Sequence, residues 1–178
     1  MLKIDSFKIE YFDRYINLYN EFIKNNSDLV PDVLELPCRN INDYEKILNE
    51  IEKRKIGNHE DTEWYKNAYY YLIFDEKEII GLGCIRCELT KLGSDVWGNI
   101  AIGVRPTQRK KGYATKIIKL LLEECKRLGM KEVIACHYVT NKITPKILNK
   151  IGAKFTNNIK SEYSGKEIKR YVINLEGK

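Results

Sequence analysis

A short segment at residues 102–115 combines residue types that can bind an anion. An apolar stretch ends at Val104, a basic loop with three cationic residues follows at 109–111, and an amphipathic helix begins near Gly112. The first N–H groups of a helix have no intrahelical partner and form the positive end of its dipole. Gly112 lets the backbone approach a ligand without an intervening Cβ. The pattern therefore predicts a loop that binds a diphosphate through backbone N–H groups and basic side chains.

The positive charge of the chain is concentrated around the same loop. The sequence has 31 Lys and Arg against 25 Asp and Glu, a net charge of +6. Between Arg105 and Lys131 nine basic residues face only Glu123 and Glu124, so this window carries +7 and the rest of the chain −1. Part of the excess is a solvated helix face, but it predicts an anionic partner, either a phosphorylated cofactor or a nucleic acid. Nucleic-acid binding is the remote alternative, because Tyr113 is the only aromatic residue among these cations.

Hydrophobic periodicity predicts the elements that must position this loop. Apolar runs and period-2 alternation predict strands over 2–5, 68–74, 79–89, 96–104, 131–138, 154–156 and 170–175. Period-3.6 spacing predicts helices over 9–25, 43–55 and 112–128, and a short one from 144 that ends at Gly152. Asn42 and Thr144 are the predicted N-caps, and residues 91–95 are a predicted loop. The order predicts an α/β domain of the α+β type with a mixed sheet, in which 96–138 is a right-handed crossover.

The cysteines and the apolar runs exclude several classes of protein. The five cysteines are odd in number and scattered, which is not a disulfide framework. Cys84 and Cys87 form a C-x-x-C, but in a strand their sulfurs face opposite sides, and no second pair completes a metal site. No apolar run reaches the roughly 20 residues that span a bilayer, and the N-terminus lacks a signal-peptide core. We therefore expect a cytoplasmic protein with no metal ion and no membrane partner.

The basic loop and its surroundings resemble the GNAT superfamily of N-acetyltransferases. Residues 109–114 match the R/Q-x-x-G-x-G/A pyrophosphate loop of that family, and V-R-P precedes them. The following helix ends in L-G, and after the next strand come Asn141-x-x-Thr144 and a helix closing with I-G-A. Members often read N-x-x-S and G-A or G-F at these places. The segment 169–173 is similar to a poorly characterised bacterial branch of the family.

This resemblance, which covers about residues 68–175, implies the fold and the domain organisation. Members have a central, mostly antiparallel and twisted sheet that splays between the fourth and fifth strands and is flanked by helices. The whole chain, 1–178, would be a single domain with residues 68–175 as the core that carries the acetyl-CoA loop. Residues 1–67 would be the variable N-terminal part that forms the acceptor wall.

The resemblance also implies the cofactor and the residues that bind it. The cofactor would be acetyl-CoA, with CoA as product, and its pantetheine arm would lie where the strand ending at Val104 splays from the strand at 131–138. The N–H of Val104 would polarise the thioester carbonyl and act in catalysis. The cofactor-binding residues would be Ile102, Gly103, Val104, Arg109, Lys110, Lys111, Gly112, Tyr113, Ala114, Thr115 and Asn141.

The groups that move protons depart from the family pattern. Many members donate a proton to the leaving sulfur from a tyrosine, and the matching position here is Leu148. Tyr138, Tyr113 or a water molecule could take that part. Glu88 and His137 are the candidate bases, against their ordinary interpretation as a surface carboxylate and a strand histidine, and a water relay needs neither. The side chains put forward as catalytic are Glu88 and Tyr138.

The resemblance implies transfer of an acetyl group from acetyl-CoA to a primary amine by direct attack on the thioester. The acceptor is a small-molecule amine or a protein amine, and the sequence does not choose between them. Five acidic residues of the expected acceptor wall suit a cationic amine or are ordinary surface carboxylates: Asp28, Asp32, Glu35, Asp43 and Glu45. The Leu148 departure leaves a non-catalytic acyl-CoA-binding sensor of the same fold as the alternative. No nucleic-acid partner is expected, and a homodimer is compatible with the sequence.

Overall fold

The strands of the protein form two antiparallel sheets that meet at one point. The structure, a computed structural model, describes residues 1–162 and 164–176. The first sheet has the order β1-β2-β3-β4, with β1 (Leu2–Ser6), β2 (Tyr65–Asp75), β3 (Glu78–Leu89) and β4 (Ile100–Val104). The second has the order β5-β7-β6, with β5 (Glu132–Tyr138), β6 (Lys154–Lys160) and β7 (Glu167–Asn174).

The predicted splay between the fourth and fifth strands is confirmed and divides the sheet into two. Every ladder within the two sheets is antiparallel. In the described part of the chain, β4 and β5 share no ladder, and a single bridge joins Gly98 to Ala135. Instead of one mixed sheet there are thus two antiparallel sheets, and the segment 96–138 connects one to the other.

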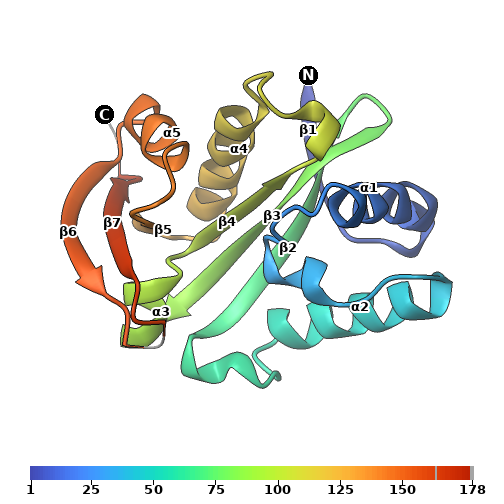
Figure 1. The fold of residues 1–178 in the computed structure, drawn as a ribbon. Coiled ribbons are helices and arrows are strands. Elements are labelled where there is room, and N and C mark those ends of the chain that lie inside the picture. The colour runs from blue at the N-terminus through green and yellow to red at the C-terminus, as the bar shows by residue number, and fades with distance from the viewer. Residues whose placement is uncertain (163, 177–178) are drawn as a thin grey trace.

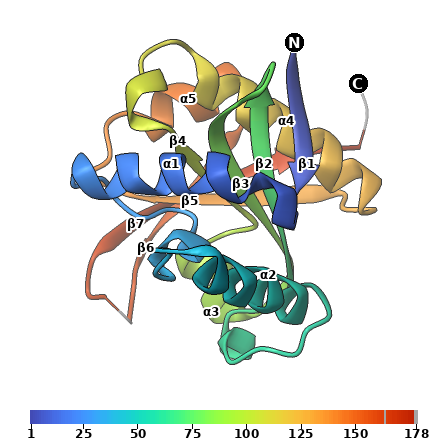
Figure 2. The ribbon, with the colours of Figure 1, turned by 90° about the vertical axis from the view of Figure 1, so that its right-hand side faces the viewer.

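Helices cover both faces of the first sheet (Figure 1). On one face lie α1 (Phe12–Lys24) and α2 (Ile41–Lys55), which Figure 2 shows in front of the strands. On the other face lies α4 (Tyr113–Arg127). Two short helices, α3 (Lys91–Val96) and α5 (Thr144–Lys150), occupy the connections before β4 and after β5. No described helix is both long enough and apolar enough to cross a membrane.

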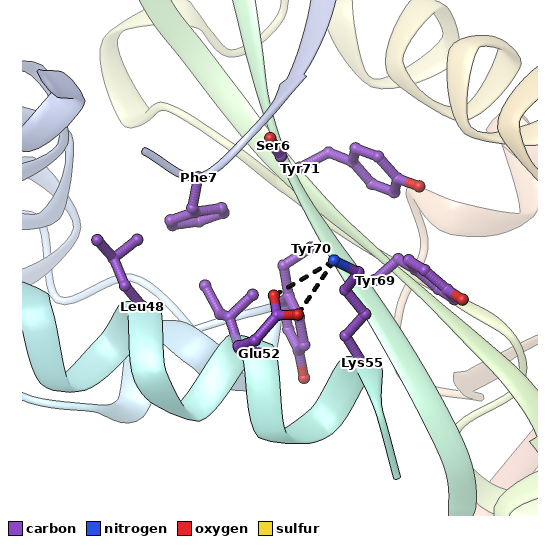
Figure 3. A pocket seen from close by; sticks show the side chains of 9 residues that line it. Ser6, Phe7, Leu48, Glu52, Lys55, Tyr69, Tyr70 and Tyr71 are labelled. Carbon is purple, nitrogen blue, oxygen red and sulfur yellow. Dashed lines mark hydrogen bonds and ion pairs between the residues drawn. The ribbon is translucent and has the colours of Figure 1, made fainter. Parts of the chain in front are cut away.

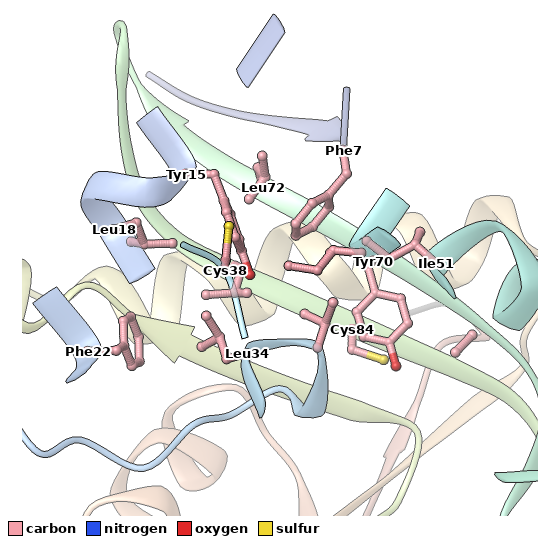
Figure 4. Packing of buried hydrophobic residues seen from close by; sticks show 14 of the residues in the cluster. Phe7, Tyr15, Leu18, Phe22, Leu34, Cys38, Ile51, Tyr70, Leu72 and Cys84 are labelled. Carbon is pink, nitrogen blue, oxygen red and sulfur yellow. The ribbon is translucent and has the colours of Figure 1, made fainter. Parts of the chain in front are cut away.

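Each face of the first sheet has its own hydrophobic core. Leu72 of β2 packs with Tyr15 and Leu18 of α1 (Figure 4), whereas its neighbour Ile73 packs with α4, represented by Leu121. All five are fully buried, and each such side chain contributes about 1.5–3 kcal/mol to stability. The central strands read as apolar runs because both of their faces are buried.

Strand alternation also places the two cysteines of the C-x-x-C on different faces. Cys84 lies in the core beneath α1 and α2, and Cys87 packs against the core beneath α4.

Two glycines of the same strand allow close packing. A Cβ on Gly81 would lie 2.5 Å from the carbonyl oxygen of Gly103, and one on Gly83 would lie 2.7 Å from Cδ1 of Leu121. Side chains at these positions would push β4 and α4 away from β3.

Two N-terminal boundaries differ from the sequence prediction. Helix α2 begins at Ile41, because the side chain of Asn40, not of Asn42, accepts the N–H of Asp43 at 3.0 Å. The predicted loop at 91–95 is helix α3, whose first turn is closed by Thr90 Oγ1 accepting from the N–H of Gly93 at 3.1 Å. The strand predicted over 96–104 consequently begins only at Ile100.

The C-terminal elements also differ from their predicted bounds. Helix α5 includes Thr144, so the predicted cap is wrong; Asn141 Oδ1 accepts the N–H groups of Ile143 and Thr144, each at 3.0 Å. Strands β6 and β7 are longer than the predicted segments 154–156 and 170–175. Strand β6 is almost fully exposed, so no apolar period marks it, and only its ladder with β7 defines it.

Candidate functional site

The outer edge of β4 is open toward the second sheet. The N–H of Arg105 donates to Ile80 O at 2.9 Å. Given the register of the two strands, the backbone groups of odd-numbered residues of β4 therefore form the hydrogen bonds to β3. Because backbone groups alternate along a strand, those of Ile102 and Val104 point away from β3. No ladder meets them in the described residues. The predicted sites Ile102 and Val104 therefore present backbone groups along the opening.

Gly103 lies between these two residues and has a different role. Its backbone pairs with Leu82 of β3, not with the opening. A Cβ on Gly103 would lie 2.1 Å from the carbonyl oxygen of Val30, which belongs to the segment between α1 and α2. Gly103 therefore makes room for that segment to cross β4, and its backbone groups point toward β3.

The loop after β4 ends in a cradle of backbone N–H groups at the start of α4. Lys110 and Gly112 have positive φ angles of 62° and 82°, and a Cβ on Gly112 would meet nothing within 4 Å. In the part of the chain that the structure describes, the N–H groups of 110–115 donate to no acceptor outside the helix. Such a run of unpaired donors at a helix N-terminus attracts an anion. The predicted residues Lys110, Lys111, Gly112, Tyr113, Ala114 and Thr115 are brought together here.

Arg109 connects the cradle to the open edge. Its Nε donates to Val104 O at 3.2 Å, and its guanidinium lies 5.6 Å from the ring centroid of Phe22. Lys111 Nζ donates to Gln108 Oε1 at 2.9 Å, which holds the loop in a tight turn. The side chains of 109–111 are exposed, so all three cations can contact a bound anion.

Arg105 anchors the same loop to α1. Its Nε donates to Glu21 Oε1 at 2.7 Å and its Nη1 to Glu78 Oε2 at 3.1 Å. Thr107 Oγ1 donates to the second oxygen of Glu21 at 2.9 Å. Burial alone would raise the pKa of Glu21, but these hydrogen bonds outweigh burial and lower that pKa. The sequence carried no signal for this contact, because Glu21 lies on a different element.

Tyr113 is held away from the opening. Its hydroxyl donates at 2.7 Å to Asp75 Oδ2 at the C-terminal end of β2, a strand that β3 separates from β4. That hydrogen bond raises the pKa of Tyr113, since losing the proton would set a phenolate beside a carboxylate. As a proton donor to a leaving thiolate, Tyr113 is therefore poorly placed.

Asn141 lies shortly before helix α5, and Leu148 lies within it. The side-chain oxygen of Asn141 accepts the N–H groups of Ile143 and Thr144, so this predicted cofactor contact holds the turn that leads into α5. Leu148, the position where family members often have tyrosine, is 1% exposed and packs in the core beneath α4. Replacing it with the larger tyrosine would overpack that core.

The structure does not bring Glu88 to Val104. The register of β3 and β4 sets Val104 opposite Gly81, and Glu88 lies seven residues further along β3. At the rise of a strand this separation is roughly 20 Å. Glu88 is exposed and forms an ion pair of 3.1 Å with Lys66. Its position is that of a surface carboxylate.

His137 and Tyr138 are the last two residues of strand β5. Tyr138 is 40% exposed, and Lys166 Nζ lies 5.1 Å from its ring centroid. His137 is buried, stacks on Tyr171 at 5.6 Å and uses Nδ1 to contact Tyr138 O at 2.8 Å. Its Nε2 has no partner among the described residues. Of the two side chains, only Tyr138 reaches solvent.

Asp32, in the segment between α1 and α2, belongs to an ion network that sequence reasoning missed. Asp32 accepts hydrogen bonds from Arg54, from Tyr70 Oη at 3.1 Å and from Arg86 Nη2 at 3.3 Å. Arg86 also lies 4.8 Å from the ring centroid of Trp97. Asp32 is therefore neutralised by arginines. Asp43, likewise, is paired with Arg39 and Lys46, so neither carboxylate is free to attract a cationic amine.

One hollow on the described part of the chain lies away from the cradle. It has a volume of about 270 Å³ and is lined by Phe7, Leu48 and Tyr70, with the ion pair of Lys55 and Glu52 at its rim (Figure 3). It sits between α2 and the β1–β2 edge of the first sheet, opposite the edge formed by β4. The anion cradle and the open edge of β4 therefore form a separate surface.

The family of the protein follows from its sequence and this geometry together. The sequence model of the Acetyltransferase (GNAT) family matches residues 39–152, more than half of the chain. The protein therefore belongs to the GNAT family of acetyltransferases, as the loop at 109–114 predicts. No curated protein shows significant similarity to the chain in sequence.

Solved acetyltransferase structures share the fold at low sequence identity. An acetyltransferase of Salmonella typhimurium that modifies the N-terminal serine of ribosomal protein L7/L12 has a TM-score of 0.67 and 12% identity, covering 97% of this chain and 94% of that one. The microcin C7 self-immunity acetyltransferase MccE, in complex with acetyl-CoA and AMP, has a TM-score of 0.66 and 15% identity, covering 97% of this chain and 92% of that one. The spermidine/spermine N-acetyltransferase SpeG of Vibrio cholerae has a TM-score of 0.64 and 16% identity, covering 98% of this chain and 95% of that one. At these identities the likeness shows the fold alone.

Proposed function

We propose that the protein transfers the acetyl group of acetyl-CoA to a primary amine, which attacks the thioester directly. The observation that carries this proposal is the continuity of the open β4 edge with the cradle at α4. The backbone groups of Ile102 and Val104 lie along this edge, and Arg109, which donates to Val104 O, is next to the unpaired N–H groups of 110–115. An arm that bears amides along its length and a diphosphate at its end fits such a surface.

The residues of this chain would bind the two ends of the cofactor differently. Gly112 and the N–H groups around it would hold the diphosphate, with the cations at 109–111 beside it. Acetyl-CoA supplies the acetyl thioester when bound. The N–H of Val104 would donate to the thioester carbonyl oxygen and stabilise the charge that develops there. A preorganised donor of this kind is worth roughly 10²–10³ in rate.

Tyr138 would return a proton to the leaving sulfur. It is the exposed phenol at the end of β5, the strand whose residues Ile134 and Ala135 contact the chain directly before β4. Water would take the proton from the attacking amine, because Glu88 lies far along β3 and His137 is buried. The acceptor would be a small-molecule amine or a protein amine.

A specific observation supports a second candidate function. Leu148 fills the family's tyrosine position with a buried core side chain. A chain that keeps the cofactor surface and lacks the proton donor would be an acyl-CoA-binding sensor. Such a sensor would bind acetyl-CoA without consuming it.

Amine-dependent release of the CoA thiol distinguishes the two functions. The protein would be mixed with acetyl-CoA and either spermidine or a peptide with an N-terminal serine, since these are the acceptor types named for similar structures. We expect thiol release that depends on the amine. Tyr138→Phe should lower kcat, whereas Glu88→Gln should leave it unchanged. Binding of acetyl-CoA with no release from any amine would favour the sensor, and no binding at all would contradict the proposal.

A further inference from the structure

Asn99, directly before β4, hydrogen-bonds to both sheets. Asn99 is 6% exposed and lies between Arg86 of β3 and Ile134 of β5. Toward β3, its carbonyl oxygen accepts from Arg86 N at 2.6 Å and its Nδ2 donates to Arg86 O at 2.8 Å. Toward β5, its N–H donates to Ile134 O at 2.8 Å and its Oδ1 accepts from Ile134 N at 2.7 Å. The side-chain amide thus acts as a second peptide group, so that Asn99 pairs fully with one residue of each sheet.

The preceding residue forces the chain close to β5 at the same point. Gly98 has a φ of +69°, and a Cβ there would lie 2.5 Å from the carbonyl oxygen of Ile134. Gly98 also makes the single bridge between the sheets, with Ala135. Beyond Asn99, β4 and β5 have no ladder in common within the described residues. The opening therefore begins at Asn99.

We propose that Asn99 is a positioning residue that sets how β4 leaves β5 and therefore how wide the opening is. An amide is suited to this place because it offers one donor and one acceptor, as a peptide group does. Without it, Arg86 O and Ile134 N–H would be buried without partners, and the sheets would shift until those groups were satisfied. The inference rests on the proposed function in one respect, because it takes this opening as the site of the pantetheine arm.

The cradle for the diphosphate does not depend on Asn99. It is formed by the start of α4 and anchored by Arg105 to Glu21 of α1. A change at Asn99 should therefore weaken binding of the pantetheine arm and leave binding of the nucleotide half of CoA intact. A general loss of stability would affect both halves.

Calorimetric titration of the full chain tests this split. The two ligands are CoA and its nucleotide half, adenosine 3′-phosphate 5′-diphosphate. We expect Asn99→Ala to weaken CoA binding about tenfold and to leave binding of the nucleotide half unchanged. Asn67→Ala is the matched control, because Asn67 Nδ2 donates only to Lys55 O, at 3.1 Å, between β2 and α2. It should change neither affinity.

Asn99→Ser covers the case in which Asn99→Ala does not fold, because a hydroxyl can keep one of the two side-chain hydrogen bonds. The same split should appear with a smaller loss of CoA affinity. A folded variant that binds CoA as well as the wild type, or that loses both ligands equally, would overturn the inference alone. A wild-type protein that does not bind CoA would overturn the proposed function, and this inference with it.

Discussion

At the scale of single residues, Gly112 combines a left-handed backbone conformation with open space where a side chain would point. Its φ of +82° is a conformation that residues with a Cβ rarely adopt, and the space where a Cβ would point is open. Gly129, at the other end of α4, has a φ of +78° and equally open surroundings. The two glycines therefore share their backbone strain and differ only in which end of the helix they occupy.

That pairing gives a controlled test of the cradle. Gly112→Glu should abolish CoA binding, because it sets a carboxylate among the N–H groups that would bind the diphosphate. Gly129→Glu should have a similar backbone cost, roughly 1–2 kcal/mol, with no effect on CoA affinity. Titration with CoA and thermal melting of both variants measure the two quantities. Equal CoA affinity in the two variants would contradict the assignment of the cradle.

At the scale of elements, Glu21 ties α1 to the loop that precedes α4. Helix α1 lies in the N-terminal part of the chain, whereas the loop belongs to the proposed cofactor surface, so the contact couples the two regions. Both side chains are mostly covered, with Arg105 14% and Glu21 22% exposed. Hydrogen bonds between charged groups in such surroundings are stronger than those at an open surface.

The lowered pKa of Glu21 predicts a pH dependence of this tie. A carboxylate with a depressed folded-state pKa stabilises the fold above its ordinary value, here 4.5, and loses that contribution as the pH falls through the lowered pKa. We expect Glu21→Gln to cost about 1 kcal/mol at pH 7. The difference from the wild type should shrink below about pH 4.5.

Denaturant unfolding at pH 7 and at pH 3.5 measures this difference. Glu123→Gln is the control, because Glu123 forms an exposed pair with Lys126 within α4. Its effect should be small at both pH values. A Glu21→Gln cost that stays constant down to the lower pH would show that the carboxylate is not the stabilising group.

At the scale of the whole molecule, the division into two sheets places the proposed cofactor surface at the boundary between them. β4 belongs to the first sheet and β5 to the second, and the direct backbone contacts between them lie at residues 98–99. A ligand in the opening would add contacts to both sheets. Binding should therefore stabilise the molecule as a unit.

Thermal melting with CoA tests this expectation. A ligand at one hundred times its Kd adds about 2.7 kcal/mol. For a chain of this size each kcal/mol raises Tm by about 2–4 °C, so we expect a rise of about 5–10 °C. Gly112→Glu should show no rise with CoA. A rise of equal size in that variant would mean that CoA stabilises the protein at another place.

The sequence predicts most of the first sheet and the start of α4, but it misses α3 and predicts β6 too short, because these two elements lack a local signal. Apolar runs identify β2 and β3, and the stripe of apolar residues identifies α4, because these patterns are read within one element. Helix α3 has no such stripe and owes its first turn to Thr90. Strand β6 has few buried side chains, and its length is decided by pairing with β7.

By itself, the sequence determined the family and the order of the main elements, and it predicted where the anion cradle lies. Those depend on neighbouring residues, such as the basic run at 109–111 before Gly112. Only the tertiary structure decided that Glu88 lies far from Val104, that Asp32 is neutralised by arginines, and that Asn99 joins the two sheets. These relations link residues far apart in the chain, and they arise from how strands pair and helices pack, which no local pattern records.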